Sequence, residues 1–322
     1  MADIALDHDN FRAALASAIA SEDAQAAFAL CIKLVWFWEL NGHLREGVSL
    51  ARTALSMPLA TPLRFDLLER MATLAFQVHQ FDVATEFVEQ LQSLAHAHDD
   101  PLERARVLNL LGRILIEQGK LEEAHAALQE NEQLARRIPH LLNPGCPLAQ
   151  LGEIALAQSD WAGAARQLHA ALALLTDAES NLYNGIFAAM AHTGLAELAL
   201  VDSNPAQARH ELRQVLPYAR LYLRRLHCLL VTLAGLLLTP LPTTPTETAQ
   251  AAATLLGAIA GLGERTGDTL SPFHEHLIAA RTATAQQLLT EYEWQAAWQQ
   301  GHAWTPAQAA DAAEQWLGLD DS

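Results

Sequence analysis

The sequence predicts an all-α protein built from repeated helical hairpins, and three observations lead to this expectation. Its 322 residues are 51% apolar and show no convincing run of alternating apolar and polar residues that would mark a strand. Its prolines and glycines fall mainly between segments with helical periodicity. A pair of one large and one small residue recurs every forty residues or so, at Met71-Ala72, Leu111-Gly112 and Leu151-Gly152.

The clearest hairpin lies between residues 108 and 128. Both of its helices carry an apolar stripe at positions i, i+3 and i+7, which is typical of an amphipathic helix. The stripe residues are Leu108, Leu111 and Leu115 in the first helix and Leu121, Ala124 and Leu128 in the second. Gly112 lies within the first stripe, where its missing side chain lets a neighbouring helix come close. Gly119 is predicted to end the first helix, because glycine adopts the left-handed conformation without a Cβ clash.

Four more copies of this pattern predict the remaining hairpins. A degenerate first copy runs through Val35, Gly42, Gly47 and Ala51, and the second continues from Met71-Ala72 through Ala84 and Val88. The fourth continues from Leu151-Gly152 through Ala164 and Leu168, and the fifth runs through Ala196, Ala208 and Leu212. Turns within hairpins are expected near His79, at Ser159-Asp160 and from Asp202 to Pro205. Loops between repeats are expected from Asp99 to Pro101, Pro139 to Pro147 and Thr176 to Tyr183.

The large-small pair, the turn glycine and the small residue of the second helix resemble the tetratricopeptide repeat (TPR). The resemblance implies a right-handed, TPR-like α-α superhelical solenoid of about five hairpins, closed by a C-terminal helical cap. It also implies that the first helix of each repeat lines a concave face. The spacing here exceeds the roughly thirty-four residues of that family, so we expect longer helices or longer loops between repeats.

Two helices are predicted at the start of the chain, over residues 10–20 and 23–40. Near the end of the second, Trp36, Phe37 and Trp38 follow one another, and consecutive residues point in different directions around a helix. At least one of these aromatic side chains therefore faces away from its own hairpin. It either packs against the N-terminal helix or forms a docking surface for a preceding domain.

After the fifth repeat, residues 217–238 are predicted to form one long helix, with Arg220, Arg224 and Arg225 on its early turns. These arginines either form a solvated face or bind an anion. The apolar part, residues 226–238, is too short for a bilayer that needs about twenty residues, so we expect a buried core helix. The proline-rich segment 241–245 then breaks the helical pattern. We expect a repeat domain at residues 1–240, a linker at 241–245 and a helical capping segment at 246–322.

The C-terminal segment carries a second resemblance. Near its end it has Trp298, Gly301, Thr305 and Ala309, and the order and spacing of these four residues carry the resemblance. This ending is similar to the tail of the helical-repeat arm in bacterial signal-transduction ATPases with numerous domains (STAND) and in large LuxR-type, MalT-like transcriptional regulators. Residues 35–47 resemble the start of the same arm. Thr305 is also a natural N-cap, with Pro306 at the first position of the last helix. The resemblance implies a sensor arm.

Catalytic motifs are missing from the sequence. Members of these families carry an ATPase module and usually a DNA-binding module, but no phosphate-binding loop of the form G-x-x-x-x-G-K-[ST] occurs here. The resemblance therefore does not extend to ATPase activity. Gly257 and Gly261 are expected at a close helix contact rather than in a dinucleotide-binding loop. No serine lies in a G-x-S-x-G context, so we expect no enzymatic activity and no cofactor.

Two histidine-containing clusters are weak candidates for a metal site. The segment 274–276 (His-Glu-His) separates its two histidines by about 200° around a helix, which is a poor arrangement for sharing a metal. The other cluster, at an expected loop, consists of His96, His98, Asp99 and Asp100. We favour solvated surface for both clusters and expect no metal.

The net charge of −17 disfavours a polyanionic partner, so we expect no direct nucleic-acid binding. The first ten residues lack the apolar core of a secretory signal, and no membrane span is expected. Cys31, Cys146 and Cys228 are far apart in sequence and are expected as buried thiols in a reducing, cytoplasmic setting.

The predicted binding site is the concave groove. Its inward-facing polar residues, aligned from Gly112, are Arg106, Asn109, Arg113, Glu117, Asp66, Glu69, Gln77, Glu153, Thr193 and Glu197. Arg106 and Arg113 are the strongest candidates, because bases are scarce in so acidic a chain. We expect the groove to bind a protein, a peptide or a small polar effector. The alternative to a sensor arm is a free-standing TPR adaptor that scaffolds a protein complex.

Overall fold

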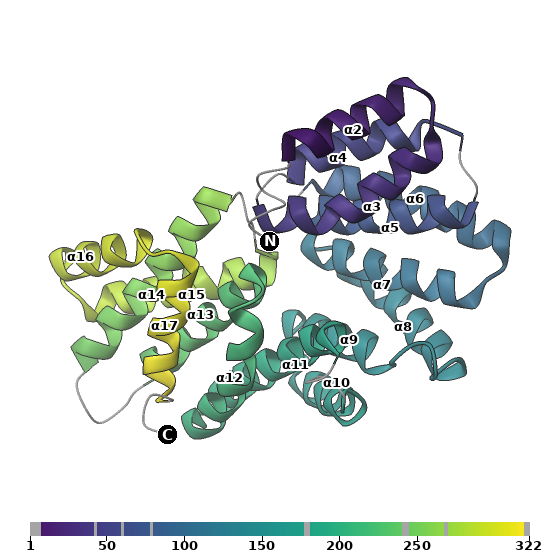
Figure 1. Ribbon diagram of the computed structural model, residues 1–322. Helices are drawn as coiled ribbons and strands as arrows, with labels where there is room; N and C mark the ends of the chain where they lie inside the picture. The colour runs from purple at the N-terminus through teal and green to yellow at the C-terminus, as the bar shows by residue number, and fades with distance from the viewer. Residues whose placement is uncertain are drawn as a thin grey trace. The chain divides into compact units, whose positions relative to one another are not determined.

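A computed structural model describes residues 8–41, 44–58, 61–77, 80–176, 181–239, 245–266 and 270–318 (Figure 1). Within these ranges every regular element is an α-helix, which confirms the all-α prediction. The helices are α2 (His8–Ala20), α3 (Ala24–Asn41), α4 (Leu44–Leu55), α5 (Thr61–Gln77), α6 (Phe81–His98), α7 (Pro101–Glu117), α8 (Leu121–Arg137), α9 (Gly145–Ala157), α10 (Trp161–Leu174), α11 (Leu182–Val201), α12 (Pro205–Ala219), α13 (Leu223–Leu238), α14 (Pro245–Thr266), α15 (Pro272–Leu288), α16 (Glu291–His302) and α17 (Pro306–Leu317).

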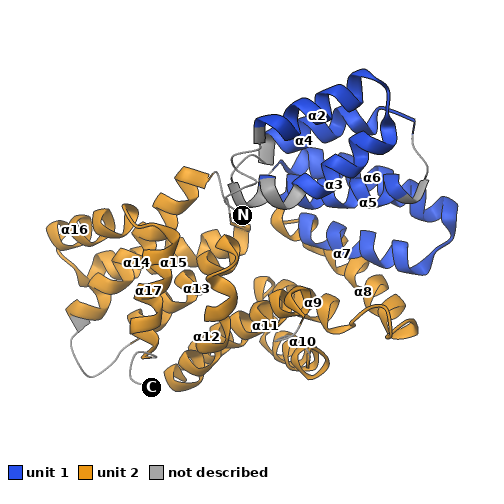
Figure 2. Cartoon of the chain, in the orientation of Figure 1, with its two compact units in different colours: residues 1–114 blue, residues 115–322 orange. Residues whose placement is uncertain are grey.

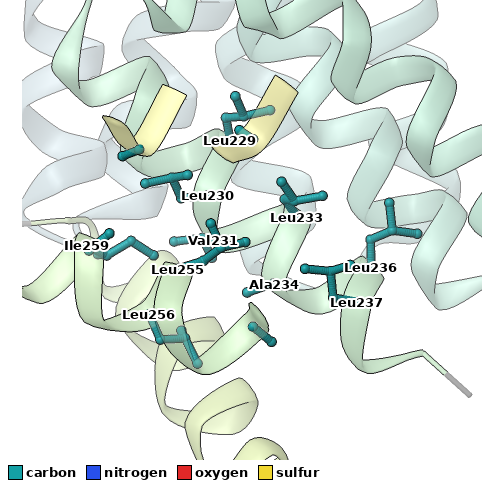
Figure 3. Packing of buried hydrophobic residues seen from close by; sticks show 14 of the residues in the cluster. Leu229, Leu230, Val231, Leu233, Ala234, Leu236, Leu237, Leu255, Leu256 and Ile259 are labelled. Atoms are coloured by element: carbon teal, nitrogen blue, oxygen red, sulfur yellow. The ribbon is translucent and has the colours of Figure 1, made fainter. Parts of the chain in front are cut away.

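The helices form two compact units, residues 1–114 and 115–322 (Figure 2). The division falls within α7, whose last turn belongs to the second unit. In the second unit, Leu233 of α13 and Leu255 of α14 lie in one buried cluster, so the helices on both sides of the proline-rich segment share a hydrophobic core (Figure 3). Residues 241–244 of the expected linker lie outside the described residues, and Pro245 begins α14.

In the first unit α3 packs with α4 and α5 packs with α6. Trp38 is fully buried against Gly47 of α4, where an added Cβ would lie 2.4 Å from the indole ring. Gly47 therefore makes room for the tryptophan, which explains why a glycine occurs at this position of the degenerate first repeat. The side chains of Trp36 and Phe37 and the whole of Gly42 lie outside the described residues.

Three hairpin turns each contain one residue in the left-handed backbone conformation. Gly119, Ser159 and Ser203 have φ angles of 72°, 60° and 56°. After the two serines, Asp160 and Asn204 cap the next helix, each accepting a hydrogen bond from the backbone N–H three residues on, at 2.9 and 3.1 Å. The turns predicted at 119, 159–160 and 202–205 are confirmed, and serine replaces glycine in two of them. The turn expected near His79 lies outside the described residues.

Small residues occur where the helices of a hairpin cross. Ala84, Ala124, Ala164 and Ala208 are all fully buried. Between α9 and α10, an added Cβ on Gly152 would lie 2.4 Å from Leu168 Cδ2. The predicted pairing of a small residue with a large one across the hairpin is therefore confirmed at this repeat.

The single helix predicted over residues 217–238 is wrong. The chain instead ends α12 at Ala219 and begins α13 at Leu223, with an extended backbone at Tyr222 (φ −129°, ψ 113°). Pro217 lies inside the last turn of α12 rather than at a helix start. Val215, Leu216 and Ala219 are buried around it, so packing holds this turn helical despite the hydrogen bond that proline cannot donate. Residues 226–238 do form the predicted buried core helix, as part of α13.

Helices α14 and α16 approach to backbone contact. An added Cβ on Gly257 would lie 2.1 Å from the Trp298 carbonyl oxygen, and one on Gly301 would lie 1.7 Å from the Thr254 carbonyl oxygen. The same holds for Gly261, so the close helix contact expected at Gly257 and Gly261 is confirmed.

The predicted cap of the last helix is also confirmed. The Thr305 hydroxyl accepts from the Gln308 N–H, the Gln308 side chain accepts from the Thr305 N–H, and Pro306 begins α17.

All three cysteines are buried thiols that form no disulfide, as expected. Burial raises the pKa of the Cys31 thiol to about 12. Among the described helices, α11 alone has the length and apolar composition to cross a membrane, and 78% of its most apolar stretch is buried within the protein.

Replacing Gly301 by alanine is expected to destabilise the protein, because the new methyl group would overlap the Thr254 carbonyl oxygen. We expect a loss of about 2 kcal/mol in the free energy of unfolding, typical of forced overpacking, measured by urea denaturation. Ala296→Ser is the matched control, since it also adds one heavy atom to α16 but at an exposed position. It is expected to change stability by less than about 0.5 kcal/mol. Equal effects of the two variants would contradict the packing argument.

Candidate functional site

The predicted groove residues lie on α5, α7, α9 and α11, which are the first helices of their hairpins. They divide between the two compact units. The first unit holds Asp66, Glu69, Gln77, Arg106, Asn109 and Arg113, and the second holds Glu117, Glu153, Thr193 and Glu197. Each set forms its own network of charges.

In the first unit, Arg106 of α7 joins two acidic side chains of α5. Its Nε donates to Glu69 Oε1 at 2.8 Å, and its Nη2 donates to Asp66 Oδ1 at 3.3 Å. The guanidinium carbon lies 5.2 Å from the centroid of the Phe65 ring, within the range of a cation–π contact. Burial by itself would lower the pKa of Arg106, but Glu69 and Asp66 outweigh burial and the pKa is raised. Three of the predicted residues therefore form one partly exposed ion-pair network.

Two turns further along α7, Arg113 lies over Phe76, with 4.5 Å between the guanidinium carbon and the ring centroid. Asn109, between the two arginines in sequence, is buried. The first unit thus presents two arginines, each placed over an aromatic ring. Arg106 already donates from this position to two carboxylates of α5, the kind of pairing that a planar guanidinium favours. The side chain of Gln77 lies outside the described residues.

In the second unit, three glutamates follow one another on successive first helices. They are Glu117 at the end of α7, Glu153 on α9 and Glu197 on α11, and their side chains are only 7%, 12% and 9% exposed. Each lies beside a cationic or titratable side chain that is far away in sequence. The pairs are Glu117 with Arg224 of α13, Glu153 with His274 of α15 and Glu197 with Arg281 of α15.

The Glu197–Arg281 pair is the most enclosed. Arg281 Nη2 donates to Glu197 Oε2 at 2.5 Å, and its Nη1 donates to the Val231 carbonyl oxygen at 2.7 Å. The Thr232 hydroxyl donates to the other carboxylate oxygen of Glu197 at 2.5 Å. Gly235 of α13 makes room for the guanidinium, because an added Cβ there would lie 2.5 Å from Arg281 Nε. Both oxygens of the buried carboxylate are therefore satisfied within the protein.

His274 occupies the neighbouring position on α15. Its Nδ1 lies 2.8 Å from the Ser271 hydroxyl and 3.9 Å from a Glu153 oxygen. Burial lowers the pKa of His274, and Arg224 lowers it further, while Glu153, Glu117 and Glu197 act in the opposite direction. The imidazole is therefore held neutral near physiological pH.

Two cavities lie along α15. The smaller, about 20 Å³, is bordered by Glu153, Thr193, Arg225 and His274 and has room for a single water molecule. The larger, about 240 Å³, lies between the turn at Gly119, α9 and the start of α15, and its polar border consists of Glu153, Ser271 and His276. Of the predicted residues, Glu153 borders both cavities, and Thr193 and Glu197 border the smaller one.

The arginines at 220, 224 and 225 do not form one solvated face. Arg220 pairs with Asp311 and Glu314 of α17 at the surface, Arg224 pairs with Glu117, and Arg225 is buried. His274 and Arg281, the partners of the glutamates on α9 and α11, were not predicted from the sequence. Their spacing of seven residues, two turns of one helix face, was the available signal.

The polar side chains of the predicted site are arranged in ion pairs and hydrogen bonds. Within the described ranges, no three His, Cys, Asp or Glu side chains come together as metal ligands would. His96 and His98 lie in the last turn of α6 and not in the expected loop, and His98 Nδ1 lies within hydrogen-bond distance of Glu103 Oε2, at 2.7 Å.

Replacing His274 by glutamine is expected to reduce the loss of stability at acidic pH. Because folding lowers the pKa of His274 below the usual value of about 6.5, the unfolded chain takes up that proton more readily. The stability contributed by neutral His274 is complete above that pH and is lost as the pH falls below it. Thermal denaturation at about pH 7 and about pH 5.5 measures the effect. His276→Gln, an exposed substitution on the same helix, is the control; an identical fall in Tm for wild type and His274→Gln would refute the prediction.

No known protein family matches the sequence, and no curated protein matches it. Among solved structures, a STAND protein with a TPR sensor from Pyrococcus horikoshii is similar, with a TM-score of 0.53 and 14% identity. The match covers 91% of this chain and 44% of that one, so the chain spans less than half of that protein.

Two smaller structures show a weaker likeness, each with a TM-score of 0.44 over 85% of this chain. They are pilF of Pseudomonas aeruginosa, with 17% identity over 97% of its length, and a TPR protein from Parabacteroides merdae, with 14% identity over 98% of its length. At such identities a structural likeness concerns the fold. The chain has an all-α fold of TPR-like helical hairpins.

Proposed function

We propose that this chain is a non-catalytic sensor or interaction module that binds a protein, a peptide or a small polar effector on the inner faces of its hairpins. The observation that carries the proposal is the pair Arg106 and Arg113. Both lie on α7 of an acidic protein, and each guanidinium lies over an aromatic ring. Arg106 is held between carboxylates of α5, and a carboxylate-bearing ligand such as an acidic peptide would exchange with one of them. The TPR-like fold supports a protein-interaction repeat domain in general.

The wider setting that we propose is a STAND-type signalling ATPase or a LuxR-type transcriptional regulator. Two observations support it: the resemblance of residues 35–47 and 298–309 to the two ends of such an arm, and the similarity to the Pyrococcus horikoshii protein, which is described as a STAND protein with a TPR sensor. In that setting an upstream ATPase module is the partner inside the same protein. A cytoplasmic location without direct nucleic-acid binding fits the charge of −17.

A free-standing TPR adaptor is the alternative function. The two proposals differ in what the native reading frame encodes around these residues, so the first experiment is the intact mass of the endogenous protein. A polypeptide several hundred residues longer, with a phosphate-binding loop in the added part, supports the sensor arm. An endogenous protein of the mass of these 322 residues supports the adaptor.

The double variant Arg106→Ala/Arg113→Ala is expected to lose binding of partners through the first unit, because both stacked cations are removed. Capture of partners from an extract of the native cells, quantified by mass spectrometry, measures the loss. The matched control is Arg104→Ala, which removes an exposed arginine from the same helix. We expect at least a tenfold loss, on the order of 1.4 kcal/mol or more, for the double variant alone. Capture that is undiminished in a double variant with the wild-type Tm would exclude this face as the binding site.

A further inference from the structure

Helix α15 departs from the order of the hairpins. The helix that follows it, α16, packs on α14 through the backbone contacts at Gly257 and Gly301. Helix α15 itself lies against α13 and α14. Because α14 and α16 hold each other directly, their packing does not require α15 to stay in place.

Besides contacting α13 and α14, side chains of α15 also contact helices that come earlier in the chain. Arg281 contacts Glu197 of α11, His274 lies near Glu153 of α9, and Pro272 lies at the turn formed by Gly119. In a regular solenoid each repeat contacts only its neighbours. Helix α15 therefore runs back across the inner face of the second unit, over the positions that the sequence predicts to bind a ligand.

The buried side chains of α15 are mostly polar. They are His274, Arg281 and Ala285, while Leu277 and Ile278 are partly buried against the core. Two of the three buried side chains are thus a histidine and an arginine. Burial of a charge pair contributes little net stability compared with apolar packing of the same size.

The socket for Arg281 selects an arginine. It consists of the Glu197 carboxylate, the Val231 carbonyl oxygen and the space left by Gly235. If α15 leaves, Glu197 loses the guanidinium that pairs with it, and any helix that covers the carboxylate again without a cation leaves an uncompensated buried charge, which is strongly unfavourable. A second helix that offers a guanidinium can remove this penalty. A side chain seven residues before it would reach Glu153, as His274 does, about 10 Å away along the helix.

We propose that α15 is a displaceable occupant of the inner face of α9, α11 and α13, and that the partner of this face is a helix carrying an arginine that enters the socket of Arg281. This inference rests on the proposed binding function and names the partner class for the second unit. Binding of the partner exchanges one arginine for another and releases α15, which is tethered to α14 and α16 at its ends. Release of α15 is then the signal that a bound partner passes to the rest of the protein.

The test uses a fluorescent synthetic peptide with the sequence of residues 271–289 as the partner helix, titrated with the full chain. Wild type binds it weakly, because its own α15 occupies the face. We expect Arg281→Ala to bind it about tenfold more tightly, since the internal competitor is weakened. The double variant Glu197→Gln/Arg281→Ala loses the gain, because the socket no longer carries its charge.

Two controls accompany the titration. Arg220→Ala removes an arginine that pairs with α17 at the surface and is expected to bind like wild type. A peptide with alanine in place of the arginine corresponding to Arg281 is expected not to bind. Equal affinity of wild type and Arg281→Ala for the intact peptide, or equal binding of the two peptides, would overturn the proposal.

A second measurement does not depend on the stability of the variants. Hydrogen exchange of the ¹⁵N-labelled wild-type chain, with unlabelled peptide in large excess, is expected to rise in α15 while α14 and α16 stay protected. Unchanged exchange in α15, or loss of protection in all three helices together, would show that α15 is not displaced. Such a result would leave the role of Arg106 and Arg113 in the first unit unaffected.

Discussion

The close approach of neighbouring helices at small residues is the constraint on which this fold depends. In the repeats the contact is between a glycine or alanine and a large side chain, as at Gly152 and Leu168. In the C-terminal part it becomes backbone against backbone, as at Gly301 and the Thr254 carbonyl oxygen. Interiors are packed so densely that one added methyl group at such a point forces a shift. The small residues therefore determine which helices pair, including the pairing of α14 with α16 that leaves α15 outside the hairpin order.

The inner glutamates of the second unit follow from that geometry. First helices that stack side by side bring Glu117, Glu153 and Glu197 into one row, and a row of partly buried like charges is unfavourable without compensation. Arg224 compensates Glu117 and Arg281 compensates Glu197, whereas Glu153 lies beside the neutral imidazole of His274. These contacts give the unit its specificity for a basic helix more than they give it stability. In the first unit, by contrast, Arg106 is compensated locally by Glu69 and Asp66, and its network stays partly exposed.

Features that depend on local sequence could be predicted. The turns at Gly119, Ser159 and Ser203, the cap at Thr305 and the glycine contacts of α14 each follow from a few consecutive residues or from one helical period. Features that depend on distant partners could not. The contact between Arg281 and Glu197 joins residues 84 positions apart, and no periodicity of α15 indicates which face of the protein it meets. The failure at Pro217 has the same origin, because buried neighbours override the local preference of proline.

The boundary between the compact units has a practical consequence for dissecting the protein. Helix α7 contributes Val107, Leu110 and Ile114 to the core of the first unit, and its last turn carries Glu117, the partner of Arg224. Cutting the chain between the units would therefore end one fragment at a frayed helix and start the other without the hydrogen-bonded turn that orients Glu117. Neither unit is a complete fragment when the chain is cut at this boundary. A cut in the loop at Asp99-Asp100 would instead take the whole of α7 from the first unit, together with the core residues that α7 contributes there.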